Sequence, residues 1–268
     1  MDLLQAIIIA VVEGLTEYLP VSSTAHMIFT SSYFGIQEDD FVKLFQVSIQ
    51  FGAILAVVFL YWRKFFDFSK FNFYIKLAAA VIPALILGKL FDDKIDAVLG
   101  NPIPIAIVLI LGGIILLFVD NRFQNPTVVT EEEITIKKAV IIGFWQCLAM
   151  MPGTSRSAAS IIGGMQQGLT RATAAEFSFF LAVPTMLAVT VYSLFLKTYE
   201  VTQLKGYELL LQGDNIKFFL IGNVIAFIVA VLAIKLFIEV IKKYGFKPWG
   251  YYRIVAGVIL LLYFSLNK

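Results

Sequence analysis

The stretch EGLTEYLPVSSTAHM, residues 13–27, interrupts a chain that is otherwise strongly apolar. It gathers two carboxylates, a run of hydroxyls and the sole histidine around a proline. A second stretch, MPGTSRS at residues 151–157, places hydroxyls and an arginine behind another proline. Proline ends or kinks a helix, and irregular backbone at membrane depth is tolerated only where protein or water covers it. We therefore expect residues 2–34 and 138–165 to form two pairs of short helices, each joined by a polar turn.

Composition indicates a membrane protein. Of the 268 residues, 59% are hydrophobic and 15% are charged, whereas a soluble domain is about 45–50% apolar. The sequence therefore predicts an all-α polytopic membrane protein with six transmembrane helices and two re-entrant helix-turn-helix segments. The single cysteine, Cys147, excludes an internal disulfide. A net charge of +2 is too small to indicate nucleic-acid binding. The six stretches long enough to cross roughly 30 Å of hydrocarbon lie near 44–62, 73–91, 103–119, 174–196, 216–238 and 251–266.

The two halves of the chain share an order of elements. A shift of 132 positions superimposes Pro20 on Pro152 and Ser23 on Ser155, and three predicted spans follow each broken segment. An odd number of spans per half reverses the direction of the second half in the membrane. The sequence therefore predicts a single integral membrane domain made of two inverted repeats. The domain covers residues 1–268, with repeats near 1–125 and 133–268 and a boundary in the polar segment 120–137.

Basic residues set the expected orientation, because loops rich in lysine and arginine stay in the cytoplasm. Such residues flank the loop after the first long span and the loop before the last one. The acidic loop 92–101 and both termini are then expected outside, and the two broken segments enter the membrane from opposite faces. The flanking residues are Arg63, Lys64, Lys70 and Lys76 in the first case, and Lys242, Lys243, Lys247 and Arg253 in the second.

The two polar turns form a candidate binding site. Serine and threonine after a proline signal a helix start, so both second half-helices are expected to aim their first amides at the middle of the membrane. Two such helix ends suit a di-anionic group such as a diphosphate. Arg156 adds a guanidinium whose fork matches phosphate oxygens. The alternatives are structural: Arg156 would pair with a carboxylate, and the hydroxyls of Thr154, Ser155 and Ser157 would only cap a helix.

The first turn also carries groups suited to catalysis. Glu13 and Glu17 lie four positions apart on one helix face, where like charges repel unless they share a proton, a cationic partner or a divalent metal. An oxygen-rich pair beside phosphate favours Mg²⁺ or Ca²⁺. His26 follows Ser23 by three residues, within reach of either the serine hydroxyl or a water. For the glutamates and the histidine, the alternative is a structural role.

These motifs resemble those of the bacterial undecaprenyl-diphosphate phosphatase family, the bacitracin-resistance proteins. The resemblance rests on EGLTE and PVSSTAH in the first half and on PGTSRS in the second. It extends to IQFGAILAV at residues 49–57 and to EFSF at residues 176–179, so it covers most of the chain. The sequence departs from the family pattern at Ala25 and Ala158, where the family often has glycine.

The resemblance implies a plasma-membrane enzyme that removes the terminal phosphate of undecaprenyl diphosphate. This regenerates the lipid carrier of cell-wall synthesis and confers bacitracin resistance. It also implies a divalent cation, Mg²⁺ or Ca²⁺, and a site facing the external side. The catalytic residues would be Glu13, Glu17, Ser23, His26 and Arg156, with the cation at Glu13 and Glu17. The substrate-binding residues would be Ser22, Thr24, Gly153, Thr154, Ser155 and Ser157.

The expected partners are the polyprenyl diphosphate lipid and the bilayer, without nucleic acid. The sequence leaves open a homodimer, and it leaves open whether serine or water attacks phosphorus. The rival function is a transporter or flippase of polyprenyl phosphate, because inverted repeats with broken helices are also a transporter architecture. A base, a nucleophile, metal ligands and a phosphate clamp together exceed what transport needs, which favours the enzyme.

Overall fold

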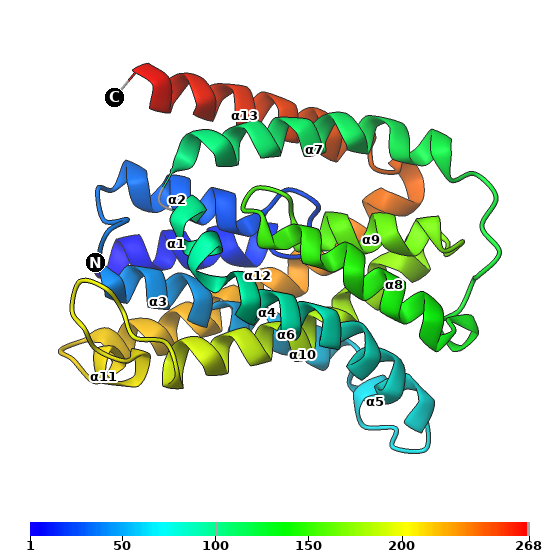
Figure 1. Ribbon diagram of the computed structural model, residues 1–268, viewed down its shortest axis with the longest axis horizontal. Coiled ribbons are helices and arrows are strands. Elements are labelled where there is room, and N and C mark those ends of the chain that lie inside the picture. Colours follow the sequence, from blue (N-terminus) through cyan, green and yellow to red (C-terminus); the bar gives the residue numbers. More distant parts are fainter. Residues whose placement is uncertain (100, 267–268) are drawn as a thin grey trace.

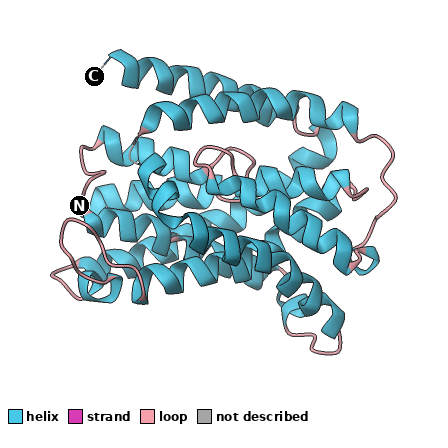
Figure 2. Ribbon diagram, in the orientation of Figure 1, coloured by secondary structure: helices cyan, strands magenta, loops and turns pink. Residues whose placement is uncertain are grey.

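Helices are the regular elements of this protein, as its composition predicts. The computed structural model describes residues 1–99 and 101–266, without the side chains of 92–97 and 99. In these residues no strand forms, and helices alternate with loops (Figure 2). The all-α fold class is therefore confirmed. The α-helices are α1 (Leu3–Thr16), α2 (Ser23–Tyr33), α3 (Asp40–Ser48), α4 (Gln50–Leu60), α5 (Trp62–Phe65), α6 (Phe71–Leu99), α7 (Pro102–Arg122), α8 (Ile136–Cys147), α9 (Arg156–Gln166), α10 (Arg171–Phe195), α11 (Gly206–Leu210), α12 (Asn215–Tyr244) and α13 (Lys247–Leu266).

Within the described residues, six segments are long and apolar enough to cross a membrane. They are Asp40–Leu60, which joins α3 and α4, Phe71–Phe91 within α6, and the helices α7, α10, α12 and α13. Each coincides with a stretch predicted from the sequence, so the polytopic fold is confirmed. The loop expected at 92–101 is instead helical as far as Leu99, because no glycine or proline stands between residues 91 and 99 to end α6. The side chains of Asp92, Asp93, Lys94 and Asp96 lie outside the described residues.

Both predicted broken segments are present as helix pairs. α1 and α2 are joined by residues 17–22, and α8 and α9 by residues 148–155, which include a short 3₁₀ turn. Figure 1 shows the two pairs entering from opposite ends of the molecule, with their turns close together near its centre. α1 begins and α13 ends at the same end of the molecule. This arrangement fits re-entrant segments, whose course in a membrane stays a prediction.

Each second half-helix starts behind a serine with an uncommon backbone conformation. Ser22 and Ser155 have φ values of 69° and 73°, in the left-handed region that non-glycine residues rarely adopt. Their Oγ atoms accept from the amides of Ala25 and Ala158, at 3.4 and 3.2 Å, so both serines cap the helix that follows. These equivalent residues lie 133 positions apart. The superposition of Ser23 on Ser155 was therefore wrong by one residue, because the second turn has one residue more between its proline and its cap.

The two halves of the chain pack against each other reciprocally. α1 packs on α12 and α8 packs on α6, while α7 and α13 lie together along one side (Figure 1). Glycines allow the close approach: a Cβ on Gly14 would stand 2.8 Å from the carbonyl oxygen of Ala226, and one on Gly143 would stand 2.2 Å from that of Ala80. Each broken pair is thus held by a helix from the other half. The exchange fits an inverted repeat, which stays a prediction.

Arg253 of α13 ties the two turns together. Its side chain is fully buried, although the sequence predicted that it flanks a cytoplasmic loop. Nη1 donates to the carbonyl oxygens of Pro20 (3.1 Å) and Thr154 (3.0 Å), and Nη2 donates to that of Gly153 (2.8 Å). Further bonds from Nε and Nη2 reach carbonyl oxygens of α7. The prediction was wrong because α13 begins at Lys247, six residues before Arg253, which places Arg253 inside the helix and against α7.

The space for this guanidinium depends on a glycine. A Cβ on Gly112 would stand 2.1 Å from Nη2 of Arg253, so a larger residue would displace the guanidinium from the turns. A buried cation is tolerated when its donors are matched by acceptors, and here five backbone carbonyl oxygens serve as acceptors. The glycine pair at 112–113 therefore has a packing role.

The basic loop after α4 and the segment between the halves also lie together. Lys64 pairs with Glu131 at 2.5 Å, and Lys70 pairs with Glu132 at 3.1 Å. Lys76, expected beside the loop, is instead buried in α6, and its ammonium donates to the carbonyl oxygens of Glu131 and Glu132. Its long stem lets a lysine within the helix reach this polar segment. These contacts fix the segment between the halves at the end of the molecule that carries the basic loop after α4. We call this the basic end.

Removing the Arg253 guanidinium should destabilise the fold through the two turns. In Arg253→Gln the shorter amide cannot reach both turns, and each buried carbonyl left unpaired costs about 1–3 kcal/mol. We expect the apparent unfolding temperature to fall by at least about 5 °C. Reaction of the half-buried Cys147 with a fluorogenic maleimide during heating would measure it. Arg63→Gln removes an exposed guanidinium as the matched control; an equal fall in both variants would contradict the role of Arg253.

Candidate active site

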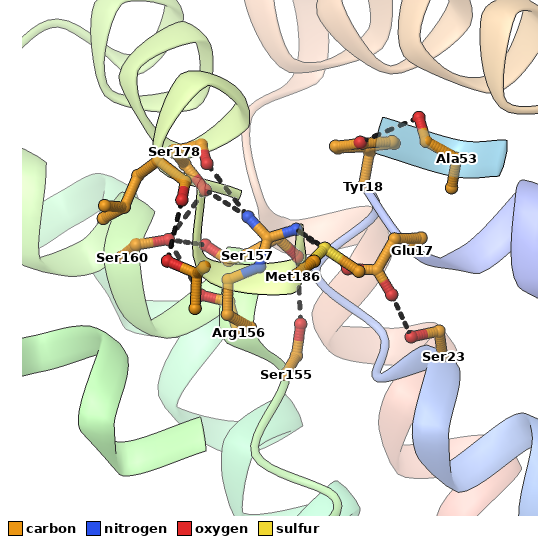
Figure 3. A network of polar contacts seen from close by, with 12 residues as sticks. Glu17, Tyr18, Ser23, Ala53, Ser155, Arg156, Ser157, Ser160, Ser178 and Met186 are labelled. Atoms are coloured by element: carbon orange, nitrogen blue, oxygen red, sulfur yellow. Dashed lines mark hydrogen bonds and ion pairs between the residues drawn. The ribbon is translucent and has the colours of Figure 1, made fainter. Parts of the chain in front are cut away.

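Three of the predicted catalytic residues meet where the two turns adjoin. The hydroxyl of Ser23 donates to Oε2 of Glu17 at 2.5 Å, and Nη2 of Arg156 donates to Oε1 at 2.8 Å. Glu17 follows α1, Ser23 begins α2 and Arg156 begins α9, so each comes from a different helix end. Figure 3 shows Glu17 between the other two in one chain of contacts. The ion pair is largely buried and joins the two halves of the protein.

Arg156 is held by more than this carboxylate. Nη1 donates to the carbonyl oxygen of Ser178 at 2.9 Å, and the guanidinium lies 5.8 Å from the ring centre of Tyr18. The hydroxyl of Ser178 lies 2.7 Å from that of Ser160, which extends the network between α9 and α10 (Figure 3). Within the described residues, Nε of Arg156 has no hydrogen-bond partner. The ion pair with a carboxylate, which was the structural alternative for Arg156, is therefore present, and one guanidinium donor remains for a ligand.

The hydroxyls expected to bind substrate also build the turns. The Ser157 hydroxyl donates to the carbonyl oxygen of Leu19 at 2.8 Å, which links the second turn to the first. It lies 3.0 Å from the hydroxyl of Ser155, which caps α9 as Ser22 caps α2. Helix capping, the alternative to substrate binding, is thus confirmed for Ser155. Each hydroxyl oxygen has two lone pairs, so capping and ligand binding are compatible.

The other predicted binding residues lie in the same two turns. Gly153 has a φ of 93°, and a Cβ there would stand 2.6 Å from the carbonyl oxygen of Ile105, so glycine is required for conformation and for space. The carbonyl oxygen of Thr154 accepts from Arg253, and its side chain is half-buried. Thr24 is half-buried in the first turn of α2. Their binding to substrate stays a prediction.

Glu13 is fully buried, and neither of its carboxylate oxygens has a hydrogen-bond partner in the described residues. It lies one helical turn before Glu17 and interacts electrostatically with Glu17, Ser23 and Arg156. A buried carboxylate without a partner is strongly unfavourable. Its two bare oxygens fit a hard divalent cation, whereas both oxygens of Glu17 are already used. The described residues hold no group of three or more acidic, histidine or cysteine side chains that could bind a metal. A cation at Glu13 would therefore need further oxygen ligands of another kind, such as hydroxyls, backbone carbonyls, water or phosphate.

His26 lies apart from the Ser23–Glu17–Arg156 chain. Its Nδ1 lies 2.8 Å from the carbonyl oxygen of Ser22, which can only accept, so Nδ1 carries a proton. Its Nε2 lies 2.8 Å from the hydroxyl of Tyr252, whose ring stacks on the imidazole with centres 5.7 Å apart. Both ring nitrogens are thus engaged away from the Ser23 hydroxyl. The catalytic role of His26 stays a prediction.

Sequence reasoning missed three groups around this site: Arg253, Tyr252 and Gln146. An arginine inside an apolar segment usually indicates a buried partner or a functional site, but Arg253 was assigned to the flank of a cytoplasmic loop. Gln146 of α8 is buried, and its Nε2 has no partner in the part of the chain that the structure describes. It lies 133 positions after Glu13, the offset that relates the two helix caps. Each half therefore buries an unpaired polar group at the equivalent place.

Comparison with known proteins matches residues 6–259 to the family described as bacitracin resistance protein BacA. The chain belongs to this family. The matched range contains both turns, all the residues of the site and Arg253. The family resemblance carried by the two turns is therefore confirmed.

Relatives align with the chain over nearly its whole length. The undecaprenyl-diphosphatase of Flavobacterium johnsoniae is 56% identical over 263 residues, which cover 98% of this chain and 96% of that protein. That of Porphyromonas gingivalis is 49% identical over 279 residues, with the same two coverages. That of Bdellovibrio bacteriovorus is 44% identical over 264 residues, again with these coverages. The similarity thus extends well beyond the two turns.

The two glutamates should respond in opposite directions to the same substitution. Glu17→Gln removes the charge that pairs with Arg156, and breaking a buried ion pair costs about 3–5 kcal/mol. Glu13→Gln removes an unpaired buried charge beside another carboxylate, so the neutral amide should stabilise the fold. With a chelator present, we expect the apparent unfolding temperature to fall in Glu17→Gln and to rise in Glu13→Gln. A fall in both would show that Glu13 has a protein partner after all.

Proposed function

We propose that the protein hydrolyses undecaprenyl diphosphate to undecaprenyl phosphate and inorganic phosphate. The reaction recycles the lipid carrier of bacterial cell-wall synthesis and confers resistance to bacitracin. The observation that carries this proposal is the buried Ser23–Glu17–Arg156 chain, which joins a hydroxyl, a base and a phosphate-binding cation where two helices begin. The BacA family and the relatives named undecaprenyl-diphosphatase support the same activity.

Phosphate recognition would come from the two helix starts. The first amides of α2 and α9 have no acceptor within their own helices, and the positive end of each helix dipole lies beside them. Ser23 and Arg156 are the first residues of these helices. A diphosphate between them would meet backbone amides from two sides and the guanidinium fork. Nε of Arg156 and Nε2 of Gln146 are further buried donors that await an acceptor.

In this proposal Ser23 attacks phosphorus. Its hydroxyl already donates to Glu17, so the carboxylate is placed to take the proton as Oγ bonds to the terminal phosphorus. The bond from this phosphorus to the bridging oxygen breaks, and undecaprenyl phosphate leaves with the electron pair. Arg156 and the amides of α2 would stabilise the charge on the transferring phosphoryl group. Water then bonds to the phosphorus of the phosphoserine as the bond from phosphorus to Oγ breaks, and Glu17 returns its proton to Oγ. Inorganic phosphate leaves with the protons of the water.

Direct attack by water is the alternative route. There the Ser23 hydroxyl would only bind phosphate, and His26 would activate the water from its position one helical turn further along α2. Tyr252 would fix the imidazole ring in either route. The 2.5 Å contact between Ser23 and Glu17 favours the serine, because it supplies the nucleophile with its own base.

A divalent cation, Mg²⁺ or Ca²⁺, is part of the proposal. Glu13 would hold it through oxygens that have no hydrogen-bond partner among the described residues, with Glu17 as its neighbour one turn away. When bound, the cation would neutralise negative charge on the diphosphate. Without the cation, the negatively charged Glu13 carboxylate would lie beside a polyanionic substrate, which is unfavourable.

An apolar cavity offers a place for the polyprenyl tail. It has a volume of about 320 Å³ and lies between α6 and α8, among side chains that include Ile82, Ile86 and Phe144. In the second turn, just past the end of α8, Leu148 and Met151 add exposed apolar side chains. A tail lying there would place its diphosphate at the site while remaining out of water.

Phosphate release from purified protein in detergent tests the function. The wild type is expected to release inorganic phosphate from undecaprenyl diphosphate and to stop when a chelator removes divalent cations. A protein that only moves the lipid would release none, since detergent leaves no barrier to cross. Ser23→Ala is expected to fall to near background, far below the roughly 10²–10³-fold loss that follows removal of one stabilising donor.

Rapid quenching during wild-type turnover should trap phosphate on Ser23. Ser265→Ala, which alters an exposed serine near the end of α13, is the matched control and should keep full activity. Substantial turnover in Ser23→Ala, with one solvent ¹⁸O in the released phosphate and no phosphoserine, would assign the attack to water.

We further propose that the protein lies in the bacterial plasma membrane with its basic end in the cytoplasm. The lysines and arginines after α4 and around the α12–α13 turn support this orientation through the positive-inside rule. The site would then face the external side, as the family resemblance implies. A homodimer stays a prediction.

Cysteine labelling in intact cells tests the orientation. Cys147 is first replaced by alanine, and single cysteines then replace Lys70 or Lys205. Both lysines are exposed, the first near the basic end and the second in the loop before α11 at the opposite end (Figure 1). A membrane-impermeant thiol reagent is expected to label the cysteine at 205 and to spare the one at 70. The reverse pattern would overturn the orientation.

A further inference from the structure

A second cavity, of about 690 Å³, lies at the basic end of the molecule. The end of α7, the loop between α9 and α10 and the turn between α12 and α13 surround it. It is separate from the site: Arg156 begins α9, whereas Met165 near the other end of α9 lines the cavity, about 14 Å away along the helix. The charged residues that line it are Arg171, Lys242, Lys243, Lys247 and Asp120.

The four cations differ in how they stand toward the helix dipoles. Lys242 and Lys243 lie in the last turn of α12, where the dipole attracts cations, so their position needs no ligand. Arg171 and Lys247 are instead the first residues of α10 and α13, where the dipole repels cations and attracts anions. Negative charge between Arg171 and Lys247 would offset this unfavourable interaction.

The protein itself supplies one part of that negative charge. Nε of Arg171 lies 2.6 Å from Oδ1 of Asp120, and Oδ2 of Asp120 accepts from the amide of Phe246 at 2.7 Å. Asp120 thus fixes both the arginine and the turn that precedes α13. Arg171 is directed at Asp120 through Nε, and its side chain is 40% exposed, so its two Nη groups are available to a ligand. Among the described residues, Lys247 takes part in no ion pair.

We propose that this cavity binds the phosphate of an anionic phospholipid headgroup. The cavity lies at the ends of four membrane-spanning helices, α7, α10, α12 and α13, which is the level of the headgroups. Basic pockets between transmembrane helices are suited to phosphorylated lipid heads. Arg171 and Lys247 would contact the phosphate, with Lys242 and Lys243 at the rim and the exposed Tyr244 at the interface. The volume far exceeds that of a free phosphate ion, which favours a headgroup.

Native mass spectrometry of the full chain in detergent, with phosphatidylglycerol or phosphatidylcholine added, tests this site. The wild type is expected to bind one phosphatidylglycerol more tightly than phosphatidylcholine. Lys243→Gln/Lys247→Gln removes two exposed cations without touching the Asp120–Arg171 pair. We expect it to weaken phosphatidylglycerol binding roughly 30-fold, as the loss of two ordinary lysine–phosphate attractions predicts.

The matched control is Lys205→Gln/Lys217→Gln, which removes two exposed lysines at the opposite end of the molecule. It should leave lipid binding unchanged, and both double variants should keep wild-type phosphate release, because neither alters the candidate active site. Equal affinity for the two lipids, or an equal loss in both double variants, would overturn the proposal. Displacement of phosphatidylglycerol by inorganic phosphate, at the concentration at which phosphate alone binds, would assign the cavity to a free ion instead.

Discussion

The hydrogen bonds between Arg253 and the carbonyl oxygens of both turns are the contacts on which the site depends. Two broken helices near the centre of an apolar molecule leave backbone carbonyls that neither helix can satisfy. One guanidinium from α13 bonds to Pro20 in the first turn and to Gly153 and Thr154 in the second. It therefore satisfies the turns and also fixes the distance between them. Glu17 begins one turn and Arg156 directly follows the other, and they can meet at 2.8 Å because that distance is fixed.

The site combines a stable part and an unstable part. Glu17, Ser23 and Arg156 satisfy one another, and Ser157 fastens the second turn to Leu19. Close by, Glu13 is buried, and its carboxylate has no hydrogen-bond partner in the part of the chain that the structure describes. A protein selected for stability alone would replace it with a neutral side chain. The unsatisfied group is thus best understood as one that acquires its partner when a ligand binds.

Much of this architecture could be predicted from the sequence. Proline followed by hydroxyls, within apolar segments, was enough to predict the two helix pairs, and the segment lengths were enough for the six spans. The sequence also assigned Glu17, Ser23 and Arg156 to one candidate site, because both turns were expected to meet near the middle of the membrane. Contacts between remote positions could not be predicted. His26 bonds to Tyr252, 226 positions away, and no sequence pattern near either residue predicts this hydrogen bond.

Two errors have physical causes that local patterns do not contain. Arg253 was assigned to a loop because a charge near the end of an apolar stretch fits the positive-inside rule equally well, and only packing against Gly112 shows that it turns inward. The superposition of the halves was wrong by one residue because prolines were matched, whereas the helices are aligned by their serine caps. A loop can gain a residue without moving the helix that follows it, so caps are the better markers of equivalence.

The two serine caps have an evolutionary consequence. Counted from Ser22 and Ser155, the first helical residue is a serine in one half and an arginine in the other. An assembly of two identical subunits with this architecture would present two hydroxyls or two guanidiniums there, never one of each. A nucleophile facing a phosphate-binding cation thus requires two copies of the scaffold that can mutate independently. In an inverted repeat, duplication of the gene for one half must therefore precede this division of labour, whether or not the copies are already fused, and each half then encodes what the other lacks.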